Sequence, residues 1–194
     1  MSADQRQSCR VFFALVPPPA LQRALGELAR DVASRMHGRA IPSENIHLTL
    51  AFIGAWPHSG LATLADVGAN LVAPAMDIML DTLGSFRRAG IAWIGIVTPP
   101  PELTLLASSL AMALAAEDVP LGGRRFHPHV TLARKCHGPH PIERAGPYAW
   151  HVDAMTLLKS ETHPEGALYT PIARWPLGER RQASEWSRAV PGPR

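Results

Sequence analysis

The fold is decided by two short stretches, Ile46-His47-Leu48-Thr49-Leu50-Ala51-Phe52 and His129-Val130-Thr131-Leu132-Ala133. Apolar residues alternate with other residues in both, which predicts β-strands that each turn one face to the core. In the first stretch the predicted core face carries Ile46, Leu48, Leu50 and Phe52. The histidine and the threonine of each stretch therefore share the opposite face.

The first stretch is preceded by a predicted strand and a predicted helix. Residues 11–16 are apolar and end at three prolines, residues 17–19, which cannot continue a β-ladder. Apolar residues then recur at the spacing of one helix face and predict a helix over residues 20–36: Leu21, Leu25, Leu28 and Val32.

The same order precedes the second stretch. Residues 91–97 predict a strand, three prolines close it at residues 99–101, and apolar spacing from Leu103 to Leu114 predicts a helix. Val11 lies 36 residues before His47, and Ile91 lies 38 residues before His129. A duplicated supersecondary unit predicts a two-lobed, pseudo-symmetric α+β fold.

The remaining elements complete a single domain over residues 1–178. A helix is predicted over residues 61–71, a weaker strand over 77–83, and two more strands over 152–158 and 168–175. Residues 179–194 are polar and rich in arginine, and we expect them to form a flexible tail.

The composition is that of a folded, water-soluble protein. The chain has 194 residues, of which 46% are hydrophobic and 18% charged, with a formal net charge of +3 and two cysteines. The mild positive charge favours an anionic partner. The few cysteines and the lack of a signal peptide or a membrane-spanning run lead us to expect a cytoplasmic protein. We expect a monomer that does not bind membranes.

Two histidines with two threonines fit phosphodiester cleavage. A neutral imidazole can accept a proton from water while a protonated one donates to a leaving oxygen. Threonine hydroxyls can donate to the non-bridging phosphate oxygens, where charge must be stabilised. We therefore expect His47 and His129 to be catalytic and Thr49 and Thr131 to bind phosphate, with no metal and no cofactor. Which histidine is the base is not decided by the sequence.

Three segments of the chain resemble the 2H phosphoesterase family, in particular the LigT-like RNA 2′,3′-cyclic phosphodiesterases, also called 2′-5′ RNA ligases. Residues 10–15 (RVFFAL) resemble the opening strand of that group, residues 47–54 (HLTLAFIG) its first motif, and residues 126–134 (FHPHVTLAR) its longer second motif. The resemblance covers most of the chain, with no departure at the four motif positions.

The resemblance implies both a fold and an activity. The fold would be bilobal, with two antiparallel sheets around a central cleft and helices outside. The activity would be hydrolysis of RNA 2′,3′-cyclic phosphate ends to 2′-phosphomonoesters, with slow reverse 2′-5′ ligation in some members. The partners would be RNA 3′ ends or nucleotide cyclic phosphates.

Several further residues are candidates for substrate binding, each with a plainer alternative. Arg134 follows the second motif and is a candidate through the resemblance, although strand alternation places it with Val130 and Leu132, away from His129. Arg124 and Arg125 precede the same motif and would contact RNA phosphates or simply be solvated.

Aromatic and metal-binding candidates are weaker. Phe12 or Phe13 would stack on a base, although a core position is the plainer interpretation. Cys136, His137 and His140 match the spacing of a zinc site poorly.

Two alternatives to the RNA 2′,3′-cyclic phosphodiesterase remain. One is a 2H phosphoesterase acting on 2′-5′ oligonucleotides or small cyclic nucleotide phosphates, which only a substrate panel separates. The other is a non-catalytic RNA-binding module, which the loss of one histidine or threonine would favour; all four are present.

Overall fold

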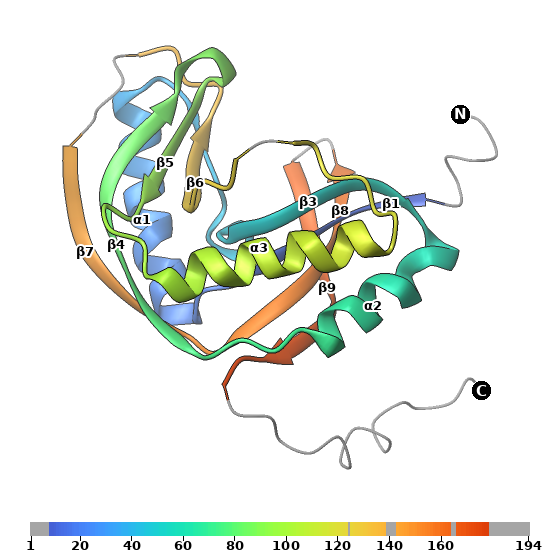
Figure 1. Cartoon of the computed structure of the whole chain (residues 1–194). Coiled ribbons are helices and arrows are strands. Elements are labelled where there is room, and N and C mark those ends of the chain that lie inside the picture. The colour runs from blue at the N-terminus through green and yellow to red at the C-terminus, as the bar shows by residue number, and fades with distance from the viewer. Residues whose placement is uncertain (1–7, 124, 139–142, 164–165, 179–194) are drawn as a thin grey trace.

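The computed structural model describes residues 8–123, 125–138, 143–163 and 166–178 (Figure 1). Its strands are β1 (Ser8–Leu15), β2 (Arg39–Ala40), β3 (Leu48–Pro57), β4 (Met76–Phe86), β5 (Ile91–Gly95), β6 (His129–Arg134), β7 (Glu143–Val152), β8 (Ala154–His163) and β9 (Gly166–Pro176). Its α-helices are α1 (Pro19–Arg35), α2 (Leu61–Asn70) and α3 (Pro101–Ala116). None of the helices in these ranges is long and apolar enough to cross a membrane. The expected tail, residues 179–194, lies outside the described residues.

The strands form two antiparallel halves that meet at the two motifs. The order along the sheet is β7-β4-β5-β6-β3-β1-β8-β9, and β2 also pairs with β6. The halves join where β3 pairs with β6, through one register pair, Leu48 opposite Val130. The expected two antiparallel sheets are these halves, connected by the motif strands at their centre.

The helices cross between the halves. α1 follows β1 in the sequence but packs against β6 and β2, whereas α3 follows β5 but packs against β3. α2 packs against α3 (Figure 1). Each motif strand is therefore covered by the helix that belongs to the other half.

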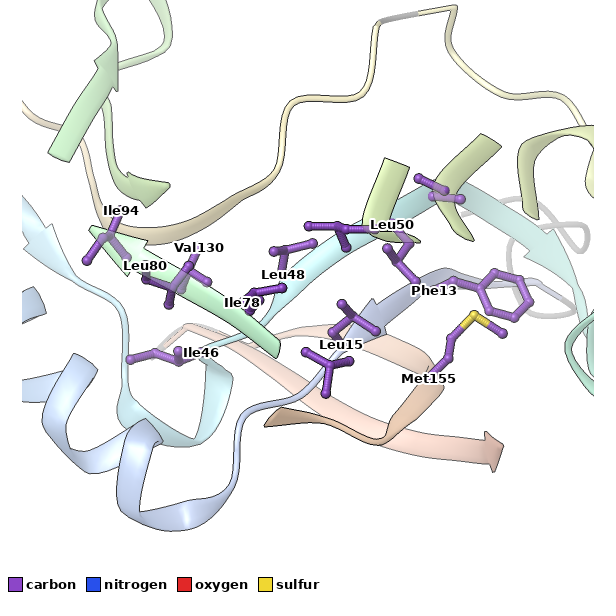
Figure 2. Packing of buried hydrophobic residues seen from close by; sticks show 14 of the residues in the cluster. Phe13, Leu15, Ile46, Leu48, Leu50, Ile78, Leu80, Ile94, Val130 and Met155 are labelled. Carbon is purple, nitrogen blue, oxygen red and sulfur yellow. The ribbon is translucent and has the colours of Figure 1, made fainter. Parts of the chain in front are cut away.

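One buried apolar cluster contains residues from both halves. Figure 2 shows Phe13 and Leu15 of β1, Leu48 of β3, Ile94 of β5 and Val130 of β6, all completely buried. Burying a side chain of this size contributes about 1.5–3 kcal/mol. The junction between the halves is thus part of the core, which fixes the two motifs relative to each other.

The predicted elements are present, with shifted ends. The first motif strand begins at Leu48, so His47 lies just before it, and the strand predicted over residues 91–97 ends at Gly95. β7 was not predicted, because only two of its ten residues, Trp150 and Val152, are buried and no alternating pattern is visible before them.

The prediction that Phe52 lies in the core is wrong, because β3 contains a β-bulge. Along β1, Ala14 pairs with Thr49 and Phe13 with Ala51, so Leu50 is an extra residue. A bulge reverses the faces of the residues that follow it. Ala51 is consequently buried, and Phe52 is 50% exposed on the face that carries the threonine.

The alternation argument for Arg134 fails for the same reason. Along β5, Trp93 pairs with Thr131 and Ala92 with Ala133, so Leu132 is an extra residue in β6. Ala133 is buried and Arg134 is exposed. The two bulges occupy equivalent positions in the motifs and turn Phe52 and Arg134 toward the same side as the threonines.

Candidate active site

His47 is held by a backbone hydrogen bond just before β3. Its Nδ1 lies 2.7 Å from the carbonyl oxygen of Asn45, and its Nε2 lies 3.1 Å from Oγ1 of Thr49. A carbonyl only accepts, so Nδ1 donates and carries the proton. In the neutral ring Nε2 is then an acceptor on the side of the threonine.

Asn45 is a positioning residue that was not predicted from the sequence. It is one of two buried polar residues in the described part of the chain, and its Nδ2 donates to the carbonyl oxygen of Ala167 in β9 at 2.6 Å. Because the Asn45 carbonyl accepts from His47, this residue connects β9 to the ring orientation of His47. No motif marked it, since its partner lies far along the chain.

His129 is held in the same way at the start of β6. Its Nδ1 lies 2.7 Å from the carbonyl oxygen of His127, again two residues earlier, so Nδ1 donates and Nε2 is the acceptor of the neutral ring. Thr131 follows on the same face and is half-buried. The two motifs therefore present both imidazoles in the same tautomer.

Aromatic rings support both histidines. The ring centroid of His47 lies 4.8 Å from that of Phe12 and 5.1 Å from that of Tyr169. The ring of His129 lies 5.0 Å from Phe86 and 6.1 Å from Trp93. Tyr169, Phe86 and Trp93 were not predicted, because they come from strands whose pairing the sequence does not reveal.

The two phenylalanines predicted as stacking candidates, Phe12 and Phe13, lie in different environments. Phe13 belongs to the main core, whereas Phe12 faces the site but is only 3% exposed beneath His47. The ring of Phe52 lies 6.4 Å from that of Phe12 and is half exposed. Phe52, not Phe12, offers an accessible ring on the face that carries Thr49.

The sequence matches a known protein family over most of its length. Residues 17–164 match the model of the 2′-5′ RNA ligase superfamily. The chain belongs to this family.

Relatives of known name agree with this assignment. The chain is 30% identical to the RNA 2′,3′-cyclic phosphodiesterase of Escherichia coli strain K12 over 87% of this chain and 96% of the relative. It is 30% identical to the enzyme of the same name from Thermus thermophilus, over 87% and 90%. The solved structure of E. coli LigT with 3′-AMP superimposes with a TM-score of 0.82 at 29% identity, covering 89% of this chain and 99% of that one. The α+β fold of the 2H phosphoesterases is thereby confirmed.

Both histidines of this family member have a lowered pKa. Burial lowers the pKa of His47 to about 4, opposed by the bond to Asn45 and aided by the charges of Arg134 and His129. Burial likewise lowers the pKa of His129, with the charges of His127 and Arg134 acting in the same direction. Both rings are thus neutral at pH 7 in the free protein, and the charge of Arg134 reaches both.

A cavity of about 1280 Å³ opens beside the motifs. Thr49 and His129 line it together with Phe52, Phe86 and the predicted Arg125. No aspartate or glutamate is found among its described lining residues. Arg124 lies outside the described residues. A smaller cavity of about 330 Å³ between α2 and α3 contains no motif residue.

Cys136, His137 and His140, whose spacing matches a zinc site poorly, form no metal-binding cluster among the residues that the structure describes. Cys136 is buried with a free thiol, and His140 lies outside the described residues. The described ranges contain no group of three or more His, Cys, Asp or Glu side chains that could hold a metal ion.

Proposed function

We propose that this protein hydrolyses 2′,3′-cyclic phosphates at RNA ends to 2′-phosphomonoesters, with His47 and His129 as its acid and base. The observation that carries the proposal is the matched pair of motifs joined at Leu48 and Val130. In both, Nδ1 is engaged by a backbone carbonyl, which leaves Nε2 to transfer protons. The names of its relatives support the same reaction.

The reaction needs one neutral and one protonated histidine. The neutral ring takes a proton from water, the water oxygen bonds to phosphorus, and the bond from phosphorus to the 3′-oxygen breaks. The protonated ring gives its proton to that 3′-oxygen. Both pKa values are lowered in the free protein, but a bound phosphate anion raises the pKa of a nearby histidine and so supplies the acid.

Neighbouring groups stabilise the charge on phosphate. Thr49 and Thr131 supply hydroxyls on the histidine face, and Arg134 supplies a positive charge close enough to act on both rings. Donors fixed before the reaction stabilise the developing charge without reorganisation. We assign these three residues to the phosphate and Phe52 to stacking on the terminal base, in place of Phe12.

A substrate panel tests the proposal. The purified protein is incubated in EDTA with a short RNA ending in a 2′,3′-cyclic phosphate, with a 2′,3′-cyclic mononucleotide and with a 2′-5′ oligonucleotide. We expect metal-independent opening of the cyclic phosphate, with a 2′-phosphate as product. A 3′-phosphate product, or turnover only of the 2′-5′ oligonucleotide, would contradict the proposed activity and indicate a different phosphoesterase.

Absence of turnover on every member of the panel would instead favour a binding module. Both histidines donate from Nδ1 to a carbonyl two residues earlier, and both motifs keep their threonine, which argues against that outcome. We expect the enzyme to be a cytoplasmic monomer. We also expect slow reverse 2′-5′ ligation as a secondary activity, which can be assayed with the same RNA ends.

A further inference from the structure

Three arginines line the cavity without a part in the two-histidine reaction. Arg87 and Arg88 belong to the short 3₁₀ segment Arg87–Ala89 between β4 and β5, and Arg125 belongs to the connection between α3 and β6. All three are exposed. Within the described ranges, none of them has an ion-pair partner.

Some arginines outside the cavity are paired with carboxylates. Arg35 contacts Asp31 at 3.0 Å and Glu143 at 2.7 Å, and Arg174 contacts Asp153 at 3.1 Å. These carboxylates neutralise arginines elsewhere, whereas the described lining of the cavity contains no carboxylate. The cavity therefore keeps unneutralised positive charge, which attracts an anionic ligand.

The three arginines belong to the side of the cavity formed around His129. Arg87 directly follows Phe86, whose ring lies 5.0 Å from that of His129. Arg125 lies two residues before His127, whose ring lies 5.8 Å from that of Phe86. Two segments far apart in sequence are thereby brought to the same wall.

The size of the cavity exceeds the need of one nucleotide. Small-molecule sites usually have volumes of about 300–1,000 Å³, whereas this cavity has about 1280 Å³. Thr104 and Ser108 of α3 add hydroxyls to its lining. Much of the cavity lining is apolar, and the extra room also carries the arginines and these two hydroxyls, which are the groups that bind phosphate and sugar oxygens.

We propose that Arg87, Arg88 and Arg125 form a second phosphate subsite that binds the phosphodiester preceding the cyclic phosphate of an RNA end. This inference rests on the proposed function and adds a preference to it. Guanidinium groups bind phosphates through paired, charge-assisted hydrogen bonds. A cyclic mononucleotide lacks that phosphodiester, so the subsite selects RNA ends over free nucleotides.

The test compares two substrates with the same terminal nucleoside. The ratio of kcat/KM for a short RNA 2′,3′-cyclic phosphate to kcat/KM for the 2′,3′-cyclic mononucleotide is measured for wild type and Arg87→Gln/Arg88→Gln. The control is Arg23→Gln/Arg30→Gln, which removes the same charge from exposed positions of α1. The ratio does not depend on the fraction of folded enzyme, so a loss of stability does not affect it.

We expect the ratio to fall roughly tenfold or more in the cavity variant, as expected when charge-assisted hydrogen bonds are removed, and to stay at the wild-type value in the control. Adding Arg125→Gln should lower it further. An unchanged kcat/KM ratio in the cavity variant, or an equal fall in the Arg23→Gln/Arg30→Gln control, would contradict the proposed subsite.

A binding measurement separates this inference from the proposed function. Fluorescence anisotropy of a labelled single-stranded RNA with a 3′-terminal phosphate is recorded over a salt series. Removing one arginine that binds a phosphate lowers the slope of log affinity against log salt by about 0.7. If no substrate is turned over, a lower slope in the cavity variant would still support the subsite. An equal slope in wild type and variant would contradict it, whatever the activity.

Discussion

At the scale of single residues, the site depends on which nitrogen of each histidine carries its proton. Backbone carbonyls at residues 45 and 127 engage Nδ1 of His47 and His129, so Nε2 is the acceptor nitrogen of both neutral rings. Thr49 then contacts Nε2 of His47 directly. The motif residues were predictable from sequence because alternation requires no knowledge of distant contacts, whereas Asn45 and Tyr169 act through partners across the fold.

The hydroxyl of Thr49 is expected to matter more than its shape. Thr49→Val keeps the volume but removes the donor, so kcat/KM on an RNA 2′,3′-cyclic phosphate should fall roughly 10²–10³-fold, the loss seen for one charge-stabilising donor. Thr49→Ser keeps the hydroxyl and should retain most of the activity. Equal activity of the valine and serine variants would show that the Thr49 hydroxyl does not contribute to the reaction.

The lowered pKa of His47 predicts a pH-dependent stability. The unfolded chain protonates this imidazole below its usual value of 6.5, but the folded protein does so only near 4. Stability present above pH 6.5 is therefore lost as the pH falls toward 4. The free energy of unfolding is measured with urea at pH 7 and at pH 4.5. Its decrease between these two pH values should be smaller in His47→Asn than in wild type, by roughly 2 kcal/mol. An identical loss in both proteins would contradict burial of a neutral His47.

At the scale of elements, the bulges at Leu50 and Leu132 decide what the strands present. Both motifs follow the same order after the threonine: two buried residues, then an exposed one. Sequence alternation predicted Phe52 in the core and Arg134 away from the site, because a bulge depends on the register with the neighbouring strand and leaves no local pattern. The presence of the strands was predictable from sequence, but the side of the sheet to which the residues after each bulge point was not.

The two faces of α3 give a matched test of packing. Leu110 is completely buried and Leu105 is 63% exposed on the same helix. Leu110→Ala should lower the free energy of unfolding by about 2–5 kcal/mol through the cavity it leaves. Leu105→Ala should change it by no more than about 0.5 kcal/mol. Similar losses in urea denaturation would mean that α3 does not cover β3 as described.

At the scale of the whole molecule, duplication explains why two halves make one site. The repeated order of strand, prolines, helix and motif predicted two lobes from sequence alone, and the halves meet at the pair of Leu48 and Val130. The crossing of α1 onto β6 and α3 onto β3 was not predictable, since periodicity gives a helix face but not its partner. That crossing fastens the motif strands into one core.

The central claim is that His47 and His129 act together, and alanine substitution tests it most directly. Single-turnover hydrolysis of an RNA 2′,3′-cyclic phosphate in EDTA is compared among wild type, His47→Ala, His129→Ala and the control His151→Ala. His151 of β7 is exposed and contacts Asp77 of the neighbouring β4 at 2.7 Å. We expect each motif variant to lose roughly 10²–10⁴-fold in rate and the control to keep the wild-type rate. Near-wild-type turnover by either folded motif variant would contradict the two-histidine account.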